Sequence, residues 1–433
     1  MTAVREVVST NEPTWLIANR QQAQQQFDAT PWPPRNQDGW RRIDLGKLAL
    51  TAPLAAASDA APTFQEVISS ENRAGLLVLH NGHAVRAELN EDLQAKGVQL
   101  LSLAEAARTL PPQMMERHIG SAVPNDLNRF TAQNAAAWRD GFFLLIPAEV
   151  EVNLPFYLVN LADAEGSTVV TRSLIMGARF SKATVVSHSV SPEGVNVYNN
   201  SVTELLVGES SSLNYINVQQ WGEQTTEIAT QRAVLDPNSS LALYNVGLGG
   251  KTTHTQVDAN MRGDGSSAKL TGLYFPHGNQ YMEYDTLQDH AAGHTSSNLT
   301  YKGVLQESGR SVFEGMILVQ PEGRFSSSGM TNRNLLLSKT AHADSVPNLE
   351  IKANEIEKCS HASSLGPVDA EQLFYLQSRG LTAEVATRVI VEGFFEEVLA
   401  QLNVPQLHDY LADAIRSKLG DTVAYLVDDD EEA

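Results

Sequence analysis

Cysteine is almost missing from this chain: a single residue, Cys359, stands among 433. One thiol excludes an intramolecular disulfide framework. It also excludes a tetrahedral metal site built by this chain alone, because such sites use about four ligands that are mostly thiolates. Basic residues are scarce too, since 31 Lys and Arg stand against 51 Asp and Glu and give a formal net charge of -20. Such a surface repels nucleic-acid phosphates and anionic lipids, so we expect no nucleic-acid partner.

Targeting signals and long apolar runs are also absent from the sequence. The first 30 residues carry mixed charge and lack the apolar segment of a secretory signal peptide. No stretch approaches the roughly 20 apolar residues that cross a bilayer as a helix. The single cysteine fits a reducing compartment. We therefore predict a soluble, cytoplasmic protein with no membrane partner.

The composition changes along the chain and divides it into three parts. Residues 1–135 mix helical stretches, Pro-rich turns and short apolar runs, which predicts a helical and mixed α/β region with a structural arm at its start. Residues 136–365 are rich in Val, Ile, Thr, Ser, Asn and Gly without a lasting helical period, which predicts short strands and turns. Residues 366–433 regain a helical period and end in the run Asp428–Glu432, predicted to be a disordered, solubilising tail.

A weak internal repeat runs through the central part. Four segments share a small polar corner followed by alternating apolar residues, and they start 28, 27 and 30 residues apart: Ser211–Val218, Ser239–Val246, Ser266–Leu273 and Ser296–Val304. A second strand-like run lies between successive segments. In a parallel β-helix each coil repeats a strand and a corner, and small residues serve the corners. The repeat therefore predicts a mainly β fold with a parallel β-helix core, and an ordinary β-sandwich with serine-rich turns is the alternative.

Helices are predicted in the C-terminal part. Asp369-Ala370-Glu371-Gln372 has the form of an N-capping box, and Gly380 suits the position just beyond a helix end at Arg379. A second helix is expected to begin near Thr382, and a third has Pro405 in its first turn.

Two aromatic pairs lie on the first two of these helices. Two adjacent residues cannot both face the same side of one helix, so at least one residue of Phe374-Tyr375 and of Phe394-Phe395 is a candidate for a partner contact. Packing in the core is the alternative for the apolar stripe of the second helix.

The cysteine lies in Lys358-Cys359-Ser360-His361. Cysteine and histidine are both metal ligands, and two residues apart on a strand they point to the same face. The motif is therefore half a metal site whose second half is missing from the sequence. A buried cysteine is also commonly an inert small hydrophobic residue, so a core thiol remains the alternative for Cys359.

Several motifs around this half site resemble one family pattern. They are Asn334-Leu335-Leu336-Leu337-Ser338, Pro347-Asn348-Leu349-Glu350-Ile351, Lys358-Cys359-Ser360-His361, Asp369–Gly380 and Gly393-Phe394-Phe395-Glu396-Glu397-Val398. Together they resemble the carboxy-terminal pattern of the SufB/SufD family, subunits of the bacterial and plastid iron-sulfur cluster assembly scaffold. Weaker similarity covers roughly residues 130–400. The resemblance implies a right-handed parallel β-helix flanked by helical regions, which agrees with the repeat.

Within this family the sequence resembles SufD more than SufB. No SufB-type cysteine occurs near Asn332 to Leu335, and Ser360-His361-Ala362 stands where SufB has a Glu-His-Glu element. The sequence also departs from the SufD pattern at Ala362–Leu365 and at Pro147-Ala148-Glu149. A divergent SufD-like paralogue therefore stays open.

The resemblance implies a non-catalytic scaffold subunit that pairs with a SufB-like subunit and docks a SufC-like ABC-type ATPase. A homodimer in isolation stays open. His361, with Cys359 as the second candidate, would hold a transient iron-sulfur cluster shared with the partner subunit, because neutral imidazole binds metal near pH 7. The residues implied for ATPase docking are Phe374, Tyr375, Arg379, Gly380, Phe394 and Phe395. Cluster type and flavin binding are left undetermined.

A polysaccharide lyase or hydrolase is the alternative function, because such enzymes also use β-helices and clustered carboxylates. Its carboxylates would come from Asp258, Asp264 and Asp285, whose convergence the sequence does not show. A cysteine hydrolase is a poorer hypothesis, because His361 is too close in sequence to Cys359 to be the distant base of such sites.

Two further patterns imitate ligand sites. Gly247–Thr252 lacks the glycine spacing of a phosphate loop, so we expect no nucleotide on this chain and assign these glycines to a turn between coils. His290 and His294 have the spacing of a helical zinc pair, but Gly293 and the strand-rich surroundings argue against a helix there.

Overall fold

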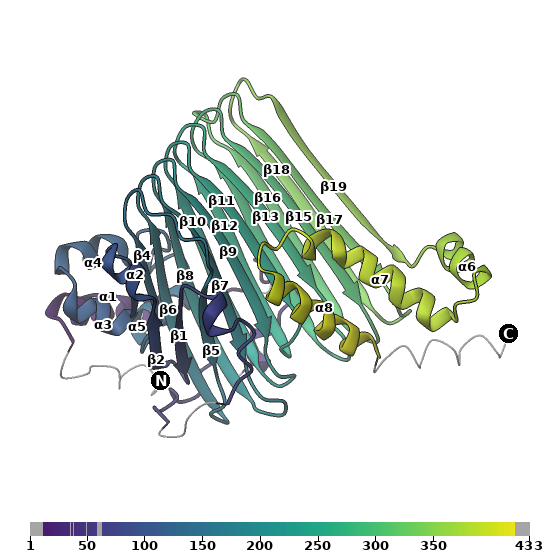
Figure 1. The fold of residues 1–433 in the computed structure, drawn as a ribbon, viewed down its shortest axis with the longest axis horizontal. Coiled ribbons are helices and arrows are strands. Elements are labelled where there is room, and N and C mark those ends of the chain that lie inside the picture. The colour runs from purple at the N-terminus through teal and green to yellow at the C-terminus, as the bar shows by residue number, and fades with distance from the viewer. Residues whose placement is uncertain (1–11, 35, 38, 49, 59–62, 421–433) are drawn as a thin grey trace.

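The computed structural model describes residues 12–34, 36–37, 39–48, 50–58 and 63–420. Over these residues the chain is mostly β and forms a parallel β-solenoid with an N-terminal α/β region and C-terminal helices (Figure 1). The predicted β-helix is therefore confirmed, and the β-sandwich alternative is wrong because strands one coil apart pair in parallel. The tail predicted at Asp428–Glu432 lies outside the described residues. None of the described helices is long and apolar enough to cross a membrane.

Each coil of the solenoid gives one strand to each of two sheets. Within the described residues, sheet 1 has ten strands in the spatial order β19 (Lys358–Pro367), β17 (Ser327–Leu336), β15 (Ser296–Leu305), β13 (Ser267–Tyr274), β11 (Ser240–Gly247), β9 (Ser212–Gln220), β7 (Lys182–Val190), β5 (Phe156–Leu161), β1 (Gly75–His80) and β2 (His83–Leu89). In the same part of the chain, sheet 2 has nine strands in the order β18 (His342–Ile351), β16 (Arg310–Val319), β14 (Tyr281–His290), β12 (Thr252–Met261), β10 (Thr226–Leu235), β8 (Val197–Val207), β6 (Ser167–Gly177), β4 (Phe142–Ile146) and β3 (Gln99–Ser102).

The four repeat segments form β9, β11, β13 and β15, which lie side by side in sheet 1. Their first residues are in register, Ser212 with Ser240 and then with Ser267. The corner serines stabilise the turns locally, because the hydroxyl groups of Ser211 and Ser239 each donate to the carbonyl three residues upstream, at 2.6 Å. A short hydroxyl side chain satisfies a corner carbonyl without filling the space of the next coil, which explains the small polar start of each repeat.

Of the glycines that imitate a phosphate loop, Gly249 and Gly250 lie in the turn between β11 and β12, as predicted, whereas Gly247 is the last residue of β11. A Cβ atom on Gly249 would lie 2.0 Å from the carbonyl oxygen of Trp221 in the preceding coil. Only glycine allows the two backbones to approach this closely. Glycine is therefore needed at position 249 so that the two coils can stack, and not to bind a phosphate.

The interior of the solenoid is mainly apolar but contains one buried carboxyl group. Glu227 lies on β10 and shares its inward face with Ala233 and Leu235 of the core. It is 5 % exposed and accepts a hydrogen bond from the amide of Asn199 at 3.0 Å. Burial raises the pKa of Glu227 to about 7, because the ionised form loses its hydration inside the solenoid.

The N-terminal part contributes helices and the first strands of both sheets. The helices are α1 (Thr14–Ala29), α2 (Glu91–Ala95), α3 (Leu103–Thr109), α4 (Pro112–His118) and α5 (Arg129–Ala137), with short 3-10 turns at Leu45–Lys47 and Ser70–Asn72. Strands β1, β2 and β3 of this part extend the two sheets of the solenoid. The arm crosses sheet 2, where the Trp40 ring stacks between Phe130, at 4.6 Å, and His254, at 4.0 Å.

A buried ion pair ties the loop after α4 to sheet 2. Arg172 and Glu204, on β6 and β8, are both almost fully buried, and their charged groups lie 2.8 Å apart. The Glu204 carboxylate also accepts backbone N–H groups from Gly120, Ala122 and Val123 at 2.8 to 3.1 Å. These additional hydrogen bonds make burial of both charges tolerable.

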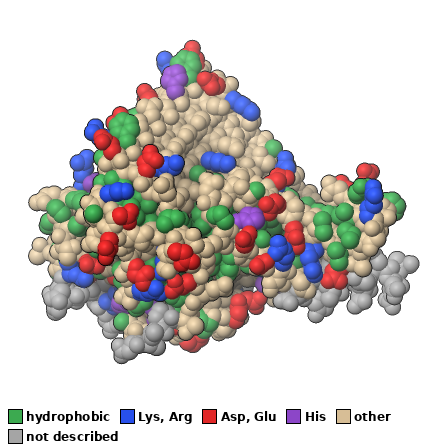
Figure 2. Space-filling model, in the orientation of Figure 1, with side chains coloured by type: hydrophobic (Ala, Val, Ile, Leu, Met, Phe, Trp, Pro, Cys, Tyr) green, Lys and Arg blue, Asp and Glu red, His purple; other side chains and the backbone are tan. Residues whose placement is uncertain are grey.

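The predicted C-terminal helices are confirmed as α6 (Ala370–Ser378), α7 (Ala383–Leu399) and α8 (Pro405–Gly420). Asp369 caps α6 by accepting the Gln372 N–H at 2.9 Å, and Thr382 caps α7. Helices α7 and α8 pack on the outer face of sheet 1, whereas α6 projects from the end of the molecule (Figure 1). They leave the starts of the sheet 1 strands uncovered (Figure 2).

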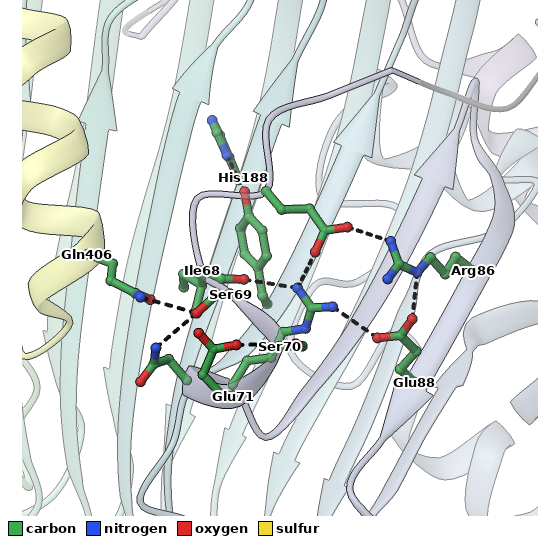
Figure 3. A network of polar contacts seen from close by, with 12 residues as sticks. Ile68, Ser69, Ser70, Glu71, Arg86, Glu88, His188 and Gln406 are labelled. Atoms are coloured by element: carbon green, nitrogen blue, oxygen red, sulfur yellow. Dashed lines mark hydrogen bonds and ion pairs between the residues drawn. The ribbon is translucent and has the colours of Figure 1, made fainter.

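A polar network joins the N-terminal region to α8 (Figure 3). The buried guanidinium group of Arg73 donates to Glu66 at 2.6 Å and to Glu88 at 3.0 Å. The neighbouring hydroxyl of Ser69 accepts a hydrogen bond from Gln406 at the start of α8, at 3.3 Å. The N-terminal region and helix α8 are therefore connected by a hydrogen bond on the outer face of sheet 1.

Candidate functional site

The solenoid has one closed end and one open end. At the N-terminal end the sheets finish with the antiparallel edge strands β2 and β3, and the buried side chains of Leu93 and Val98 cover the interior between them. At the other end β18 and β19 each pair with a single strand, β16 and β17 respectively, among the described residues (Figure 1). Their outer edges carry backbone groups that no further strand of the described chain covers. An edge of this kind is a template for pairing with another chain.

The open end exposes the interior layer of the last coil. Leu349 and Ile351 on β18 are 37 % and 43 % exposed, although their register partners on β16, Ile317 and Val319, are completely buried. Leu365 on β19 is 51 % exposed. These three side chains follow the inward alternation of the earlier coils but have no next coil above them among the described residues. We call this surface, defined by Leu349, Ile351 and Leu365, the open end.

The predicted ligand pair lies on this surface. Cys359 and His361 are on β19, in register with the inward-facing Ser328 and Met330 of β17. The prediction that both share one face is confirmed, and their Cα atoms are separated by about 6.6 Å, the rise of two strand residues. Cys359 is half-buried against the main core, whereas His361 is exposed and makes no hydrogen bond or ion pair with the described residues.

Cys359 and His361 together offer two metal-ligating side chains, fewer than a cluster site needs. Among the described residues no three His, Cys, Asp or Glu side chains converge as a metal site. With a single cysteine in the sequence, the chain supplies one thiolate at most. A cluster held here needs further ligands from outside this chain.

A second exposed surface lies on α6 and α7 (Figure 2, right end). Phe374 and Tyr375 are 72 % and 56 % exposed, and Val385 and Val389 on α7 are also exposed. The Arg379 guanidinium lies 5.2 Å from the centre of the Tyr375 ring and donates to its hydroxyl. Gly380, at φ 93°, ends α6 in the left-handed conformation that glycine adopts freely. We call Phe374, Tyr375, Val385 and Val389 the α6–α7 face.

The second aromatic pair packs against sheet 1, and the assignment of Phe395 to a docking surface needs correction. Phe395 is fully buried beneath α7, with its ring 6.2 Å from that of Phe275, so it is not available to a docked partner. Phe394 is half-buried over the Lys302 ammonium, 4.5 Å from its ring centre. Lys302 pairs with Glu397, and burial beneath α7 lowers the pKa of this lysine. The pair therefore anchors α7 to β15.

The remaining candidates have structural partners. His290 is buried on β14 and bonded to the hydroxyls of Thr295 and Ser297, and burial lowers its pKa to about 4. His294 stacks on Phe325 at 5.1 Å in a corner, so the helical spacing of the two histidines has no meaning here. Asp258 is bonded to Arg232 at 2.7 Å.

Asp264 and Asp285, the other proposed carboxylates, lie in different parts of the solenoid. Asp264 follows the end of β12 and accepts the backbone N–H of Gly293. Asp285 lies within β14. They do not form the carboxylate cluster that the alternative enzyme requires.

Sequence reasoning missed the open end and the exposure of Val385 and Val389. The alternation of Leu349 and Ile351 is the same as in an interior coil, so nothing local marks them as uncovered. For α7, the signal was its apolar stripe, which is wider than one packed face needs.

Comparison with known proteins gives a consistent result over most of the chain. The family model described as "SUF system FeS cluster assembly, SufBD core domain" matches residues 160–394, and the model of the SufBD protein N-terminal region matches residues 1–158. An iron-sulfur cluster assembly SufBD family protein of Mycobacterium leprae is 32% identical over 304 residues, which cover 69% of this chain and 76% of that protein. A protein of the same description from Staphylococcus saprophyticus is 23% identical over 416 residues, 92% of this chain and 88% of the relative.

Proposed function

Because the chain belongs to the SufBD family of iron-sulfur cluster assembly proteins, we propose that it is a SufD-like scaffold subunit that assembles clusters together with a SufB-like subunit. The observation that carries this proposal is the open end, where two uncapped strands, exposed core residues and two metal donors occur together. The cluster is cargo passed on to other proteins. The polysaccharide enzyme considered from the sequence has no observation in its favour.

Pairing through the open end explains why a solenoid of this length stops with its interior uncovered. A SufB-like solenoid placed against β18 and β19 would bury Leu349, Ile351 and Leu365 and continue the strand ladders. Burial of apolar core residues is the main source of affinity in permanent interfaces. In the absence of that partner, a second copy of this chain offers the same surface, so a homodimer is the expected form of the isolated protein.

The cluster ligands would then come from two chains. His361 supplies an imidazole nitrogen from the rim of the open end, and the partner supplies the thiolates that this chain lacks. Cys359 lies two residues before His361 on the same face of β19 and packs against the main core. It is therefore either a second cluster ligand or a core thiol. The scaffold role needs no catalytic group on this chain.

A SufC-like ABC-type ATPase would dock on the α6–α7 face, with Arg379 and Gly380 fixing the position of the two aromatic rings. Helix α6 follows β19 almost directly, since only Val368 and the cap Asp369 separate them. A force applied to α6 by the ATPase therefore acts on the strand that carries Cys359 and His361. We place the protein in the cytoplasm, where ATP and reduced thiols are available.

The test of the site is anaerobic cluster reconstitution on the complex of this chain with its SufB-like and SufC-like partners. His361→Ala should lose most of the cluster absorbance, because one ligand is removed. Ser363→Ala is the matched control, since Ser363 lies two residues further along the same face of β19. Unchanged absorbance in the histidine variant would remove the ligand assignment. Cys359→Ala distinguishes a ligand from a core thiol, because a core thiol leaves the absorbance unchanged.

The test of pairing is co-purification of the two solenoid chains. Leu365→Asp places a charge on the open end and should abolish the complex, whereas Val85→Asp on β2 at the closed end, where Val85 is 43 % exposed, should not. A complex that survives Leu365→Asp would show that the chains meet elsewhere.

A further inference from the structure

A groove runs along sheet 1 between the corners and the helices that cover the rest of this face. It crosses the starts of the strands from β7 to β19 and has a volume of about 640 Å³, with Asn403 of the α7–α8 loop on its rim. Figure 2 shows this part of the face as a hollow, largely tan area above the helices, because serine and asparagine side chains and backbone atoms, all drawn in tan, make up much of its walls. The groove is therefore an uncovered sheet face of regular shape.

The charge of this groove is opposite to that of the protein as a whole. Lys182, Lys269 and Lys358 line it, and no aspartate or glutamate of the described residues does. All three lysines are exposed, and none forms an ion pair with a carboxylate in the part of the chain that the structure describes. The groove therefore carries three positive charges on a chain whose formal net charge is -20.

The three lysines lie on the first, middle and last strands that the groove crosses. Lys182 and Lys358 stand at the ends of one register row, with Ser212, Ser240, Ser267, Ser296 and Ser327 between them. Six strand spacings separate the two ends, about 29 Å. Lys269 lies on the middle strand, two residues beyond the row, and is about 16 Å from either end. The sheet's backbone groups are used by its own ladders, so side chains alone make contacts here. Ammonium and hydroxyl donors in this pattern fit an extended acidic segment.

We propose that the groove binds the chain's own acidic C-terminal segment, Asp428–Glu432. This segment carries five consecutive carboxylates, the strongest negative run in the sequence. The described chain ends at Gly420, at the far end of α8 from Asn403. Helix α8 is about 24 Å long, since it has 16 residues at 1.5 Å each.

The length of the remaining chain matches this path. Residues 421–427 lead from Gly420 to Asp428, and eight extended steps span at most about 28 Å. The tail can therefore return along α8 and place its first carboxylate at the groove. The five acidic residues then cover about 16 Å, close to the separation of Lys269 from Lys358. Charge and reach therefore both allow the tail to cover about half of the groove.

A tail bound in the groove would change the charge around the proposed cluster site. The binding itself does not require that a cluster is held there. Lys358 immediately precedes Cys359, so a bound tail brings five negative charges to the start of β19. Other acidic segments would be kept out of the groove by the same charges. The inference stands on the groove and the tail alone and holds whether or not the chain pairs with a SufB-like subunit.

Zero-length carbodiimide cross-linking of the full chain tests this proposal, because the reagent joins a lysine only to a carboxylate in direct contact. We expect peptides that link Lys269 or Lys358 to residues 428–432 in the monomer, at a yield at least about tenfold above links from Lys96, an exposed lysine at the end of α2. The yield should fall at least about fivefold when the salt concentration rises from about 20 mM to about 0.5 M. Replacing the five tail carboxylates by amides should abolish these links.

A second measurement uses the lysines themselves. Truncation after Val427 should raise the rate of acetylation of Lys269 and Lys358 several-fold and leave that of Lys96 unchanged. Equal cross-linking of Lys96 would overturn the proposal, and so would groove links found only in covalent dimers. Unchanged acetylation after truncation would equally refute it.

Discussion

The buried carboxyl group of Glu227 gives a prediction whose sign and size follow from its position inside the solenoid. Burial raises its pKa from an ordinary value of 4.5 to about 7. Below pH 4.5 both the folded and the unfolded chain carry the proton, so the group costs nothing. Between pH 4.5 and about 7 the unfolded chain loses the proton while the folded chain keeps it, so the free energy of unfolding falls as the pH rises. Above that window the cost is constant.

The magnitude follows from the difference between the two values. A pKa raised from 4.5 to about 7 corresponds to about 3 kcal/mol, at about 1.36 kcal/mol for each tenfold change in the proton affinity. Glu227→Gln keeps the shape and the hydrogen bond from Asn199 but has no charge to bury. We therefore expect the variant to be more stable than the parent by about 3 kcal/mol near pH 8.5 and by less than about 1 kcal/mol near pH 5.

Guanidinium unfolding followed by circular dichroism at the two pH values measures this difference. Other titrating groups, including Glu283, whose pKa burial raises to about 8, are present in both proteins and cancel in the comparison. Glu322→Gln, at an exposed corner, is the matched control and should show no pH-dependent gain. A stabilisation by Glu227→Gln that is equal at the acidic and the alkaline pH would refute the argument, because it would then come from packing and not from charge.

Three further changes test docking and packing. Phe374→Ala should weaken binding of the SufC-like ATPase by about 2 to 3 kcal/mol, roughly 30- to 150-fold in calorimetry, because most of a 72 % exposed phenyl ring would be buried by the partner. Glu204→Ala should cost about 3 to 5 kcal/mol in chemical unfolding, because it leaves the buried Arg172 guanidinium without its counter-charge. Gly249→Ala should lower the thermal midpoint, because its methyl group meets the Trp221 carbonyl at 2.0 Å and the coils must separate.

Each of these changes has a control and a contradicting result. Val85→Ala should leave ATPase binding unchanged, and equal losses for Val85 and Phe374 would point to a general change in the protein. Glu322→Ala should not alter stability, and a Glu204 variant as stable as this control would mean that the ion pair contributes nothing. For Gly249, an unchanged midpoint would show that the turn can shift at no cost.

The regular part of the fold was predictable because it rests on local periods. Small polar corners and alternation by two residues recur in each coil, so strands β9 to β15 could be recognised directly, and the same alternation placed Cys359 and His361 on one face. The helix caps at Asp369 and Thr382 depend on neighbouring residues and were equally accessible.

Other features depend on contacts between distant residues and have no local signal. Phe395 is buried and Phe394 is half-buried because of where β13 and β15 lie beneath α7. These strands are roughly 90 to 120 residues earlier in the chain. The exposure of Leu365 depends on there being no further coil among the described residues, which no pattern around residue 365 records. The hydrogen bond from Gln406 to Ser69 joins residues 337 positions apart in the sequence.

The two ends of the solenoid differ in a way that bears on assembly size. A repeat architecture with an uncovered interior at both ends can add units without limit, as a fibre does. Here the buried side chains of Leu93 and Val98 cover the interior beside β2 and β3, whereas the core residues of the last described coil are uncovered. If two open ends pair as proposed, both are used and this surface cannot recruit a third chain. The proposed pairing is therefore self-limiting and predicts an assembly with two solenoids at its centre.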